Sequence, residues 1–192
     1  MRGSNRRRRR TDRGVTMIEA AITSPLVLLL IFGVLEFGIL FKDYLSLSSG
    51  VRDGVRVAST QGAEPLTDYK VLQIVLRRMP ALERNQIQRV VVFRGTSADS
   101  TVPTACKTAS SATLKCNSYS NADLSRPATD FVGTGSAPDR YWPPITRKER
   151  LSDPPDYVGV WIKVHHEAVT GLFPLTKDLE EEVVMRIEPA RL

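Results

Sequence analysis

The sequence contains few of the residues on which catalysis and metal binding depend. Histidine occurs only at His165 and His166, and cysteine only at Cys106 and Cys116. Neighbouring residues of a strand point to opposite faces of a sheet, so the two histidines are poorly placed to share one metal ion. The chain also lacks a glycine-rich phosphate loop, a nucleophile elbow and an H-E-x-x-H motif. We therefore expect a protein that is not an enzyme and that has no cofactor or metal site.

Net charge is missing from most of the chain. The formal net charge of +6 lies entirely in residues 1–14, which hold seven arginines and one aspartate. An arginine block of this kind could be a nucleic-acid-binding arm or a nuclear-targeting signal. Because a membrane-length apolar segment follows it, the block is better explained as a determinant of membrane topology. We therefore expect a basic cytoplasmic leader over residues 1–14 and no nucleic-acid partner.

Charged residues are absent from Ala20 to Leu35, and apolar character extends over Ile18–Phe41. About 20 such residues span a bilayer as a helix, so the segment predicts a transmembrane helix. A cleaved secretory signal is the alternative, because Ser46-Leu47-Ser48 could be its cleavage site. The run is longer than the core of about 7–15 residues that a signal peptide has, which favours retention. Since positive residues stay in the cytoplasm, the amino terminus is expected inside and residues beyond about 43 outside.

Two glutamates accompany this apolar segment. Glu19 lies near its start, and Glu36 lies within it as a second membrane-segment carboxylate. A charged side chain inside hydrocarbon costs about 2.5 kcal/mol or more, so Glu19 is expected to be near the interface, protonated or paired. Glu19 follows Gly14 by five positions, and the arginine block precedes that glycine.

The order of arginine block, Gly14, Val15 and Glu19 resembles the processing site of type IV prepilins. The resemblance implies that a membrane prepilin peptidase cuts after Gly14, which would make Val15 the new amino terminus. It also implies that the Glu19 carboxylate pairs with the amino terminus of a neighbouring subunit during assembly, so that two charges are neutralised in lipid.

The continuation "GVTMIEAAITSPLVLLLIFGVLEFGILF", followed by "GVRDGVRVAS", resembles TadE-like proteins, the minor pilin-like components of the tight-adherence (Tad or Flp) pilus machinery. The Glu36-Phe37-Gly38 triplet and the stretch from Arg52 to Arg56 carry much of the similarity, which covers about residues 14–60. The resemblance implies a subunit of the bacterial cytoplasmic membrane that can enter a surface pilus. Its implied partners are other pilin-like subunits and the pilus assembly platform. Two alternatives are an uncleaved single-pass protein with an outer binding domain and a secreted hydrolase.

The region after the span predicts a small α+β head outside the membrane, over residues 61–192. Leu47, Val51, Val55 and Ala58 form one apolar stripe, so the pilin-like helix, which begins at residue 15, is expected to continue to about residue 60. A second helix is expected to begin at Thr67 or Asp68 and to end before Pro80. Alternating apolar residues predict an antiparallel sheet with one face covered by the long helix. Its three expected strands are Ile87–Gly95, Tyr157–Val169 and residues 181–188.

Residues 96–156 form a long polar stretch, expected to be a partly ordered excursion or a contact loop. Cys106 and Cys116 lie in this loop and are disulfide candidates, since an exported domain favours a disulfide, and two unrelated thiols are the alternative. The small ring that such a bond closes would stabilise the fold by about 2–3 kcal/mol. Trp142 is expected to anchor the loop against the domain, with an exposed contact site as the alternative.

Overall fold

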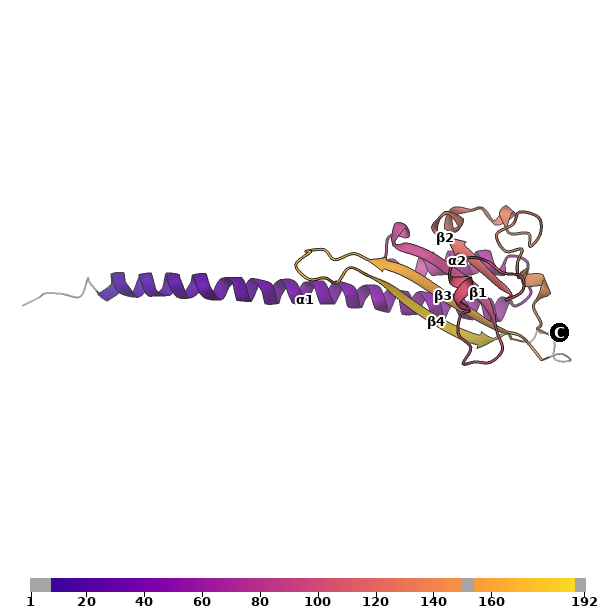
Figure 1. Cartoon of the computed structure of the whole chain (residues 1–192), viewed down its shortest axis with the longest axis horizontal. Coiled ribbons are helices and arrows are strands. Elements are labelled where there is room, and N and C mark those ends of the chain that lie inside the picture. The colour runs from indigo at the N-terminus through magenta and orange to yellow at the C-terminus, as the bar shows by residue number, and fades with distance from the viewer. Residues whose placement is uncertain (1–7, 150–153, 189–192) are drawn as a thin grey trace, which may run out of the picture. The chain divides into compact units, whose positions relative to one another are not determined.

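The computed structural model describes residues 8–149 and 154–188 (Figure 1). Residues 1–7, half of the predicted basic leader, lie outside the described residues. The chain divides into two compact units: Met1–Leu40 with Ala168–Leu175, and Phe41–Glu167 with Thr176–Leu192. The first unit holds the apolar part of the long helix, and the second is the head.

The helix α1 runs from Arg8 to Gln61 without interruption, although Pro25 lies inside it. It ends where Gly62 takes a positive φ of 51° and donates its N–H to the Ala58 carbonyl at 3.2 Å. Glycine adopts this left-handed conformation without a steric penalty and commonly terminates helices. The end predicted near residue 60 is therefore confirmed, and the helix begins before the expected position 15.

The head contains a four-stranded antiparallel sheet with the order β2-β1-β3-β4. Its strands are β1 (Ile87–Gly95), β2 (Cys116–Ser120), β3 (Tyr157–His166) and β4 (Lys177–Arg186). The α+β class and the antiparallel sheet are thus confirmed. The expected number of three strands was wrong, because β2 arises from the polar stretch and pairs with β1. The bounds of the last two strands also differ from the expected ones. Strand β3 ends at His166 and not at Val169, and β4 begins at Lys177, four residues before the expected position 181.

The two faces of the sheet are both covered. On one face lie the end of α1 and the helix α2 (Thr67–Arg78): a Cβ added to Gly54 would lie 3.2 Å from Val75 Cγ2 and 3.6 Å from Val160 Cγ1. On the other face, the segment that contains the disulfide packs against β1 and β3. This second core cluster contains Val91, Phe93, Val102, Cys106, Cys116 and Trp161. The alternation predicted for β3 places Val160 and Trp161 on these opposite faces.

A buried polar network holds the stretch 96–156 against α2. The Asp68 carboxylate accepts hydrogen bonds from Arg147 Nη2 at 2.6 Å, Asn117 Nδ2 at 2.9 Å and the Tyr119 hydroxyl at 2.6 Å. Burial, together with the charge of Asp68, raises the pKa of Tyr119 well above its ordinary value, so its hydroxyl remains a donor at neutral pH. Trp142 is buried and its backbone N–H donates to Asn117 Oδ1 at 2.9 Å. The tryptophan therefore anchors the stretch, as expected.

Candidate functional site

The predicted cleavage point lies in an accessible part of α1. A Cβ added to Gly14 would meet no heavy atom within 4 Å among the described residues, and Val15 is 65% exposed. Both residues are helical, so their peptide bond is protected only by the hydrogen bonds of a single helix. Glycine weakens such a helix locally by about 1 kcal/mol relative to alanine. This position therefore combines access with a low local resistance to unwinding.

Glu19 lies on the surface of the same helical segment and is exposed. Its backbone carbonyl accepts a hydrogen bond from the Thr23 hydroxyl at 2.9 Å. Residues four apart on a helix lie one turn apart on the same face, so Val15 and Glu19 share a face. A positive group at Val15 and the Glu19 carboxylate would thus occupy the same side of the helix.

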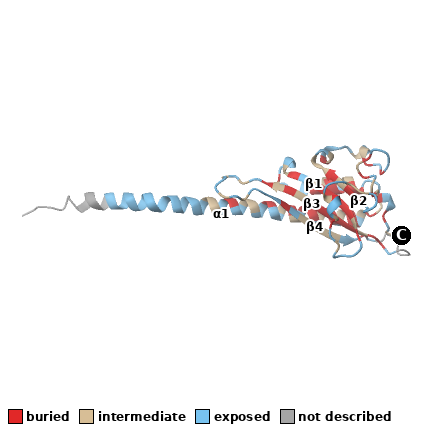
Figure 2. Cartoon of the chain, in the orientation of Figure 1, coloured by how far each residue is buried: buried red, intermediate tan, exposed pale blue. Residues whose placement is uncertain are grey.

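The middle of α1 has an apolar sequence, and Figure 2 shows most of this part of the helix in the colour of exposed residues. Ile22, Leu26 and Val34 are 72%, 67% and 73% exposed, and the segment between them is similar. Among the described residues, this helix alone has the length and the apolar composition to cross a membrane. A helix that is apolar all round requires either a core or lipid around it. The chain supplies little core here, so the surface fits a membrane span.

Glu36 differs from the surface that surrounds it, because it is only 1% exposed. The cover comes from the connection between β3 and β4, which belongs to the same compact unit as this part of α1. Thr170 in that connection donates its backbone N–H to Glu36 Oε2 at 3.2 Å. Glu36 Oε1 has no hydrogen-bond partner among the described residues. The second carboxylate of the apolar segment is thus shielded by the chain itself.

Cys106 and Cys116 form a disulfide in the structure. Both are fully buried and lie beside Trp161 in the core cluster on one face of the sheet. The disulfide therefore helps to close the head over that face, and its place in the core is structural.

The two histidines have separate carboxylate partners. His165 Nδ1 lies 2.7 Å from Asp178 Oδ1, and His166 Nδ1 lies 2.7 Å from Asp43 Oδ2. No cluster of three or more potential metal ligands occurs among the described residues. The histidines thus belong to structural pairs at different places in the head.

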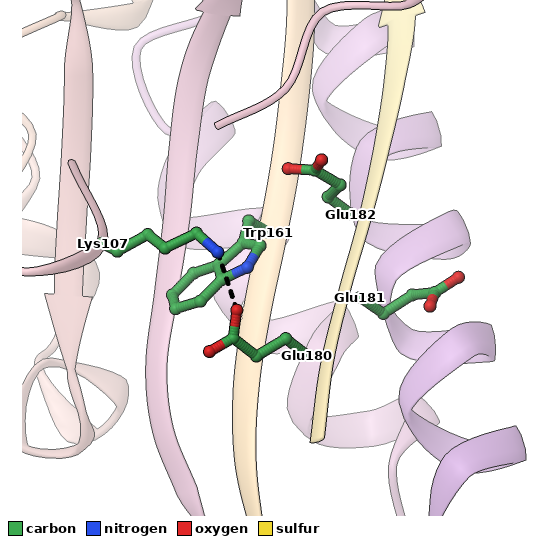
Figure 3. A pocket seen from close by; sticks show the side chains of 5 residues that line it. All are labelled: Lys107, Trp161, Glu180, Glu181 and Glu182. Carbon is green, nitrogen blue, oxygen red and sulfur yellow. Dashed lines mark hydrogen bonds and ion pairs between the residues drawn. The ribbon is translucent and has the colours of Figure 1, made fainter. Parts of the chain in front are cut away.

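A shallow pocket lies over Trp161, beside the glutamates of β4 (Figure 3). Lys107 Nζ forms an ion pair with Glu180 at 2.7 Å and lies 4.9 Å from the centre of the Trp161 ring. Glu182 accepts the Val102 N–H at 2.8 Å, and Figure 3 shows Glu181 on the other side of the strand. The Lys107–Glu180 ion pair and the Val102–Glu182 hydrogen bond thus hold the disulfide-containing segment to β4.

Residues 14–56 match the family model described as TadE-like protein. The amino-terminal segment of this chain is TadE-like. Over these residues the match confirms the resemblance that the sequence predicted. No curated protein and no solved structure matches the chain.

The TadE-like segment contains Gly14, Val15, Glu19 and Glu36. The apolar helix and the family together support a membrane location for the protein. Sequence reasoning missed Thr170 as the partner of Glu36. A signal was present, because the connection that contains Thr170 has the apolar residues Val169, Leu172 and Phe173 where a surface turn is normally polar.

Proposed function

We propose that this TadE-like chain is a minor pilin subunit of a Tad-type adhesion pilus, processed by a prepilin peptidase and assembled through α1. Residues 1–14 form a cytoplasmic leader, residues 15–60 form the membrane and assembly helix, and residues 61–192 form an extracytoplasmic head. The partners are the peptidase, other pilin-like subunits and the assembly platform. The protein acts by insertion and contact and has no chemistry of its own.

The observation that carries this proposal is the exposed apolar surface of α1 inside a TadE-like match that begins at Gly14. A soluble protein rarely leaves a contiguous apolar patch of this extent in water. Lipid covers this apolar surface before assembly, and the helices of neighbouring subunits cover it afterwards. The same surface therefore supports both membrane storage and assembly.

Cleavage after Gly14 changes the electrostatics of the amino terminus. Residues 1–14 contain the whole formal net charge of +6, so their removal leaves a chain whose side chains sum to zero. The new amino group at Val15 is a cation on the same helix face as the exposed Glu19 carboxylate. In lipid, each charge lowers the cost of the other when they pair across neighbouring subunits. Processing thus removes the basic block that keeps the amino end in the cytoplasm, and it creates a partner for Glu19.

Mass spectrometry of the mature amino terminus from membranes tests the processing step. We expect the native chain to begin at Val15 and the Gly14→Val variant to keep its leader. Gly38→Val is the matched control, because a Cβ at Gly38 also meets no heavy atom within 4 Å among the described residues. The control should be processed normally. A native chain that keeps residues 2–14 would contradict the proposal and favour an uncleaved membrane-anchored binding protein, whereas a terminus near Ser49 would indicate a secreted protein.

The Glu19→Ala variant separates processing from assembly. We expect its mature chain to begin at Val15 and its share in a sheared pilus fraction to fall at least tenfold. Glu19→Asp, which keeps the charge, should recover part of that share. Normal incorporation of Glu19→Ala would contradict the assembly role of this carboxylate.

A further inference from the structure

The connection between β3 and β4 is apolar where a surface turn is normally polar. Residues 168–175 read AVTGLFPL and contain no charged side chain, whereas Glu167 and Lys177 lie just outside them. Val169 is 69% exposed and Leu172 is 61% exposed. We call residues 168–175 the β3–β4 tip.

The β3–β4 tip lies against the membrane segment of α1 within one compact unit (Figure 1). The Thr170 N–H donates to Glu36 Oε2 at 3.2 Å. The Phe173 ring lies at Gly33, where an added Cβ would be only 3.3 Å from Phe173 Cζ. The missing side chain at Gly33 therefore makes room for the phenylalanine, and the tip is fitted to this part of the helix.

These two contacts lie inside the apolar span. Gly33 and Glu36 precede Phe41, the last residue of the expected span, by eight and five positions. At a rise of about 1.5 Å per residue, these positions are about 12 Å and about 8 Å inside the end of the span. A segment that contacts α1 at this depth shares the surroundings of the helix there.

The backbone of the tip suits an apolar environment. Non-helical backbone is tolerated at membrane depth only where its polar groups find partners in the protein. The Thr170 N–H bonds to Glu36, the Leu172 N–H bonds to Thr170 Oγ1 at 3.3 Å, and the Leu175 N–H bonds to the Phe173 carbonyl at 2.8 Å. Proline at position 174 has no N–H to satisfy. Internal bonds thus replace several of the contacts that water would otherwise provide.

We propose that the β3–β4 tip is a second membrane contact, which enters the outer leaflet and places Val169 and Leu172 among the lipid acyl chains. This inference rests on the proposed placement of α1 across the membrane. The tip also covers Glu36, so that a carboxylate in the span meets a backbone donor and not lipid. Lipid is favoured over a second copy of the chain as the occupant, because the uncharged tip is continuous with the lipid-facing surface of the span.

Spin labels on the full chain in vesicles of phosphatidylcholine and phosphatidylglycerol test the inference. Both native cysteines are held in a disulfide, so a single added cysteine provides one labelling site. The variants are Val169→Cys and Leu172→Cys in the tip, with Leu35→Cys as the lipid control and Val132→Cys as the water control. Leu35 is 53% exposed in the span and Val132 is 59% exposed in the head. Collisions with oxygen, which concentrates in lipid, are compared with collisions with a water-soluble nickel chelate.

We expect both tip labels to match the Leu35→Cys label, with an oxygen-to-nickel collision ratio at least fivefold above that of Val132→Cys. Tip labels that match Val132→Cys, while Leu35→Cys reports lipid, would overturn this inference and leave the proposed function intact. A Leu35→Cys label in water would overturn both. Tip labels shielded from both reagents would show a protein neighbour in place of lipid and would also overturn the inference.

Discussion

The two parts of α1 carry similar apolar side chains but bury them in different ways. In the part that precedes the head, Leu30 is 59% exposed. Further along the same helix, Leu47, Val51 and Val55 are fully buried. The first part is apolar on every face, whereas the second repeats apolar residues only at every third or fourth position. One helix therefore has an exposed apolar surface in its first part and an apolar stripe buried against its own head in its second part.

The buried carboxylates of the two compact units show the same contrast. Asp68 in the head accepts three hydrogen bonds and pairs with the buried Arg147. Glu36 in the span accepts one backbone hydrogen bond through Oε2, and its Oε1 has no partner among the described residues. Arg147 Nε and Nη1 have no hydrogen-bond partner among the described residues, so the network of Asp68 is not complete either, but it holds its carboxylate through three donors and one countercharge. Asp68 is thus fixed by more contacts than Glu36, which one backbone donor holds.

The largest effect is expected when the buried charge pair of the head is broken. Asp68→Asn leaves Arg147 without its countercharge, and the Arg147 side chain is completely buried. Loss of one partner of such a pair lowers the free energy of unfolding by about 3–5 kcal/mol. Chemical denaturation of the full chain in detergent micelles, followed by the fluorescence of the buried tryptophans, measures this loss.

Asp53→Asn is the matched control for Asp68→Asn. Asp53 pairs with Arg78 at 2.8 Å, but the Arg78 side chain is 56% exposed and the Asp53 side chain is 32% exposed. Exposed pairs contribute about 0–1 kcal/mol, so this variant should remain close to the native stability. Equal losses of unfolding free energy in the two variants would show that the buried pair contributes no more to stability than the exposed pair.

The second prediction tests which face of α1 is buried where the helix meets the head. Leu47→Ala deletes a fully buried side chain and should lower the free energy of unfolding of the head by about 2–5 kcal/mol. Leu45→Ala removes the same atoms two positions earlier, where the side chain is exposed, and should change it by less than about 0.5 kcal/mol. The same denaturation experiment measures both. A Leu45→Ala loss as large as that of Leu47→Ala would contradict the burial of only one face of the helix at this point.

Much of the fold could be predicted because its signals are local. The apolar stripe and Gly62 mark the end of α1, and the β-branched run Ile87–Gly95 became β1 with the same bounds. Strand β2 could not be predicted in this way, because its sequence, CNSYS, has no β-branched residue. Its place depends on pairing with β1 and on the disulfide that begins at Cys106, which are both non-local contacts.

The residues of the candidate site likewise include some that are close in sequence and some that only the fold brings together. Gly14 and Glu19 are five positions apart in one segment, so their resemblance to a processing site is readable from the sequence, and their roles stay a prediction. Thr170 and Glu36 are 134 residues apart, and Asp68 and Arg147 are 79 residues apart. No periodicity links residues at such distances, because the folded topology brings them together. The cover over Glu36 and the network under the polar stretch therefore became visible only in the structure.

The smallest expected effect concerns a carboxylate in the head whose hydrogen bonding is incomplete, as it is at Glu36. Asp139 is fully buried; its Oδ1 accepts the Gly133 N–H at 3.0 Å, and its Oδ2 has no partner among the described residues. Burial raises the pKa of Asp139 above its ordinary value of 3.8, and the charge of Asp68 adds to this rise. Above its raised pKa the folded state therefore holds a poorly solvated charge, which lowers stability at neutral pH.

Asp139→Asn should therefore stabilise the head at pH 7 by less than about 1 kcal/mol, because asparagine keeps the acceptor for Gly133 and removes the charge. As the pH falls through the raised pKa of Asp139 toward its ordinary value, the folded native chain takes up the proton first, and the advantage of the variant should shrink. Denaturation of both proteins at pH 7 and pH 4 measures this difference while the other carboxylates cancel. A variant that is less stable at pH 7, or an advantage that persists unchanged at pH 4, would show that Asp139 is held by a partner that its buried surroundings do not reveal. Asp139 would then be stabilised in a different way from Glu36, which the β3–β4 tip covers and to which the tip donates one backbone hydrogen bond.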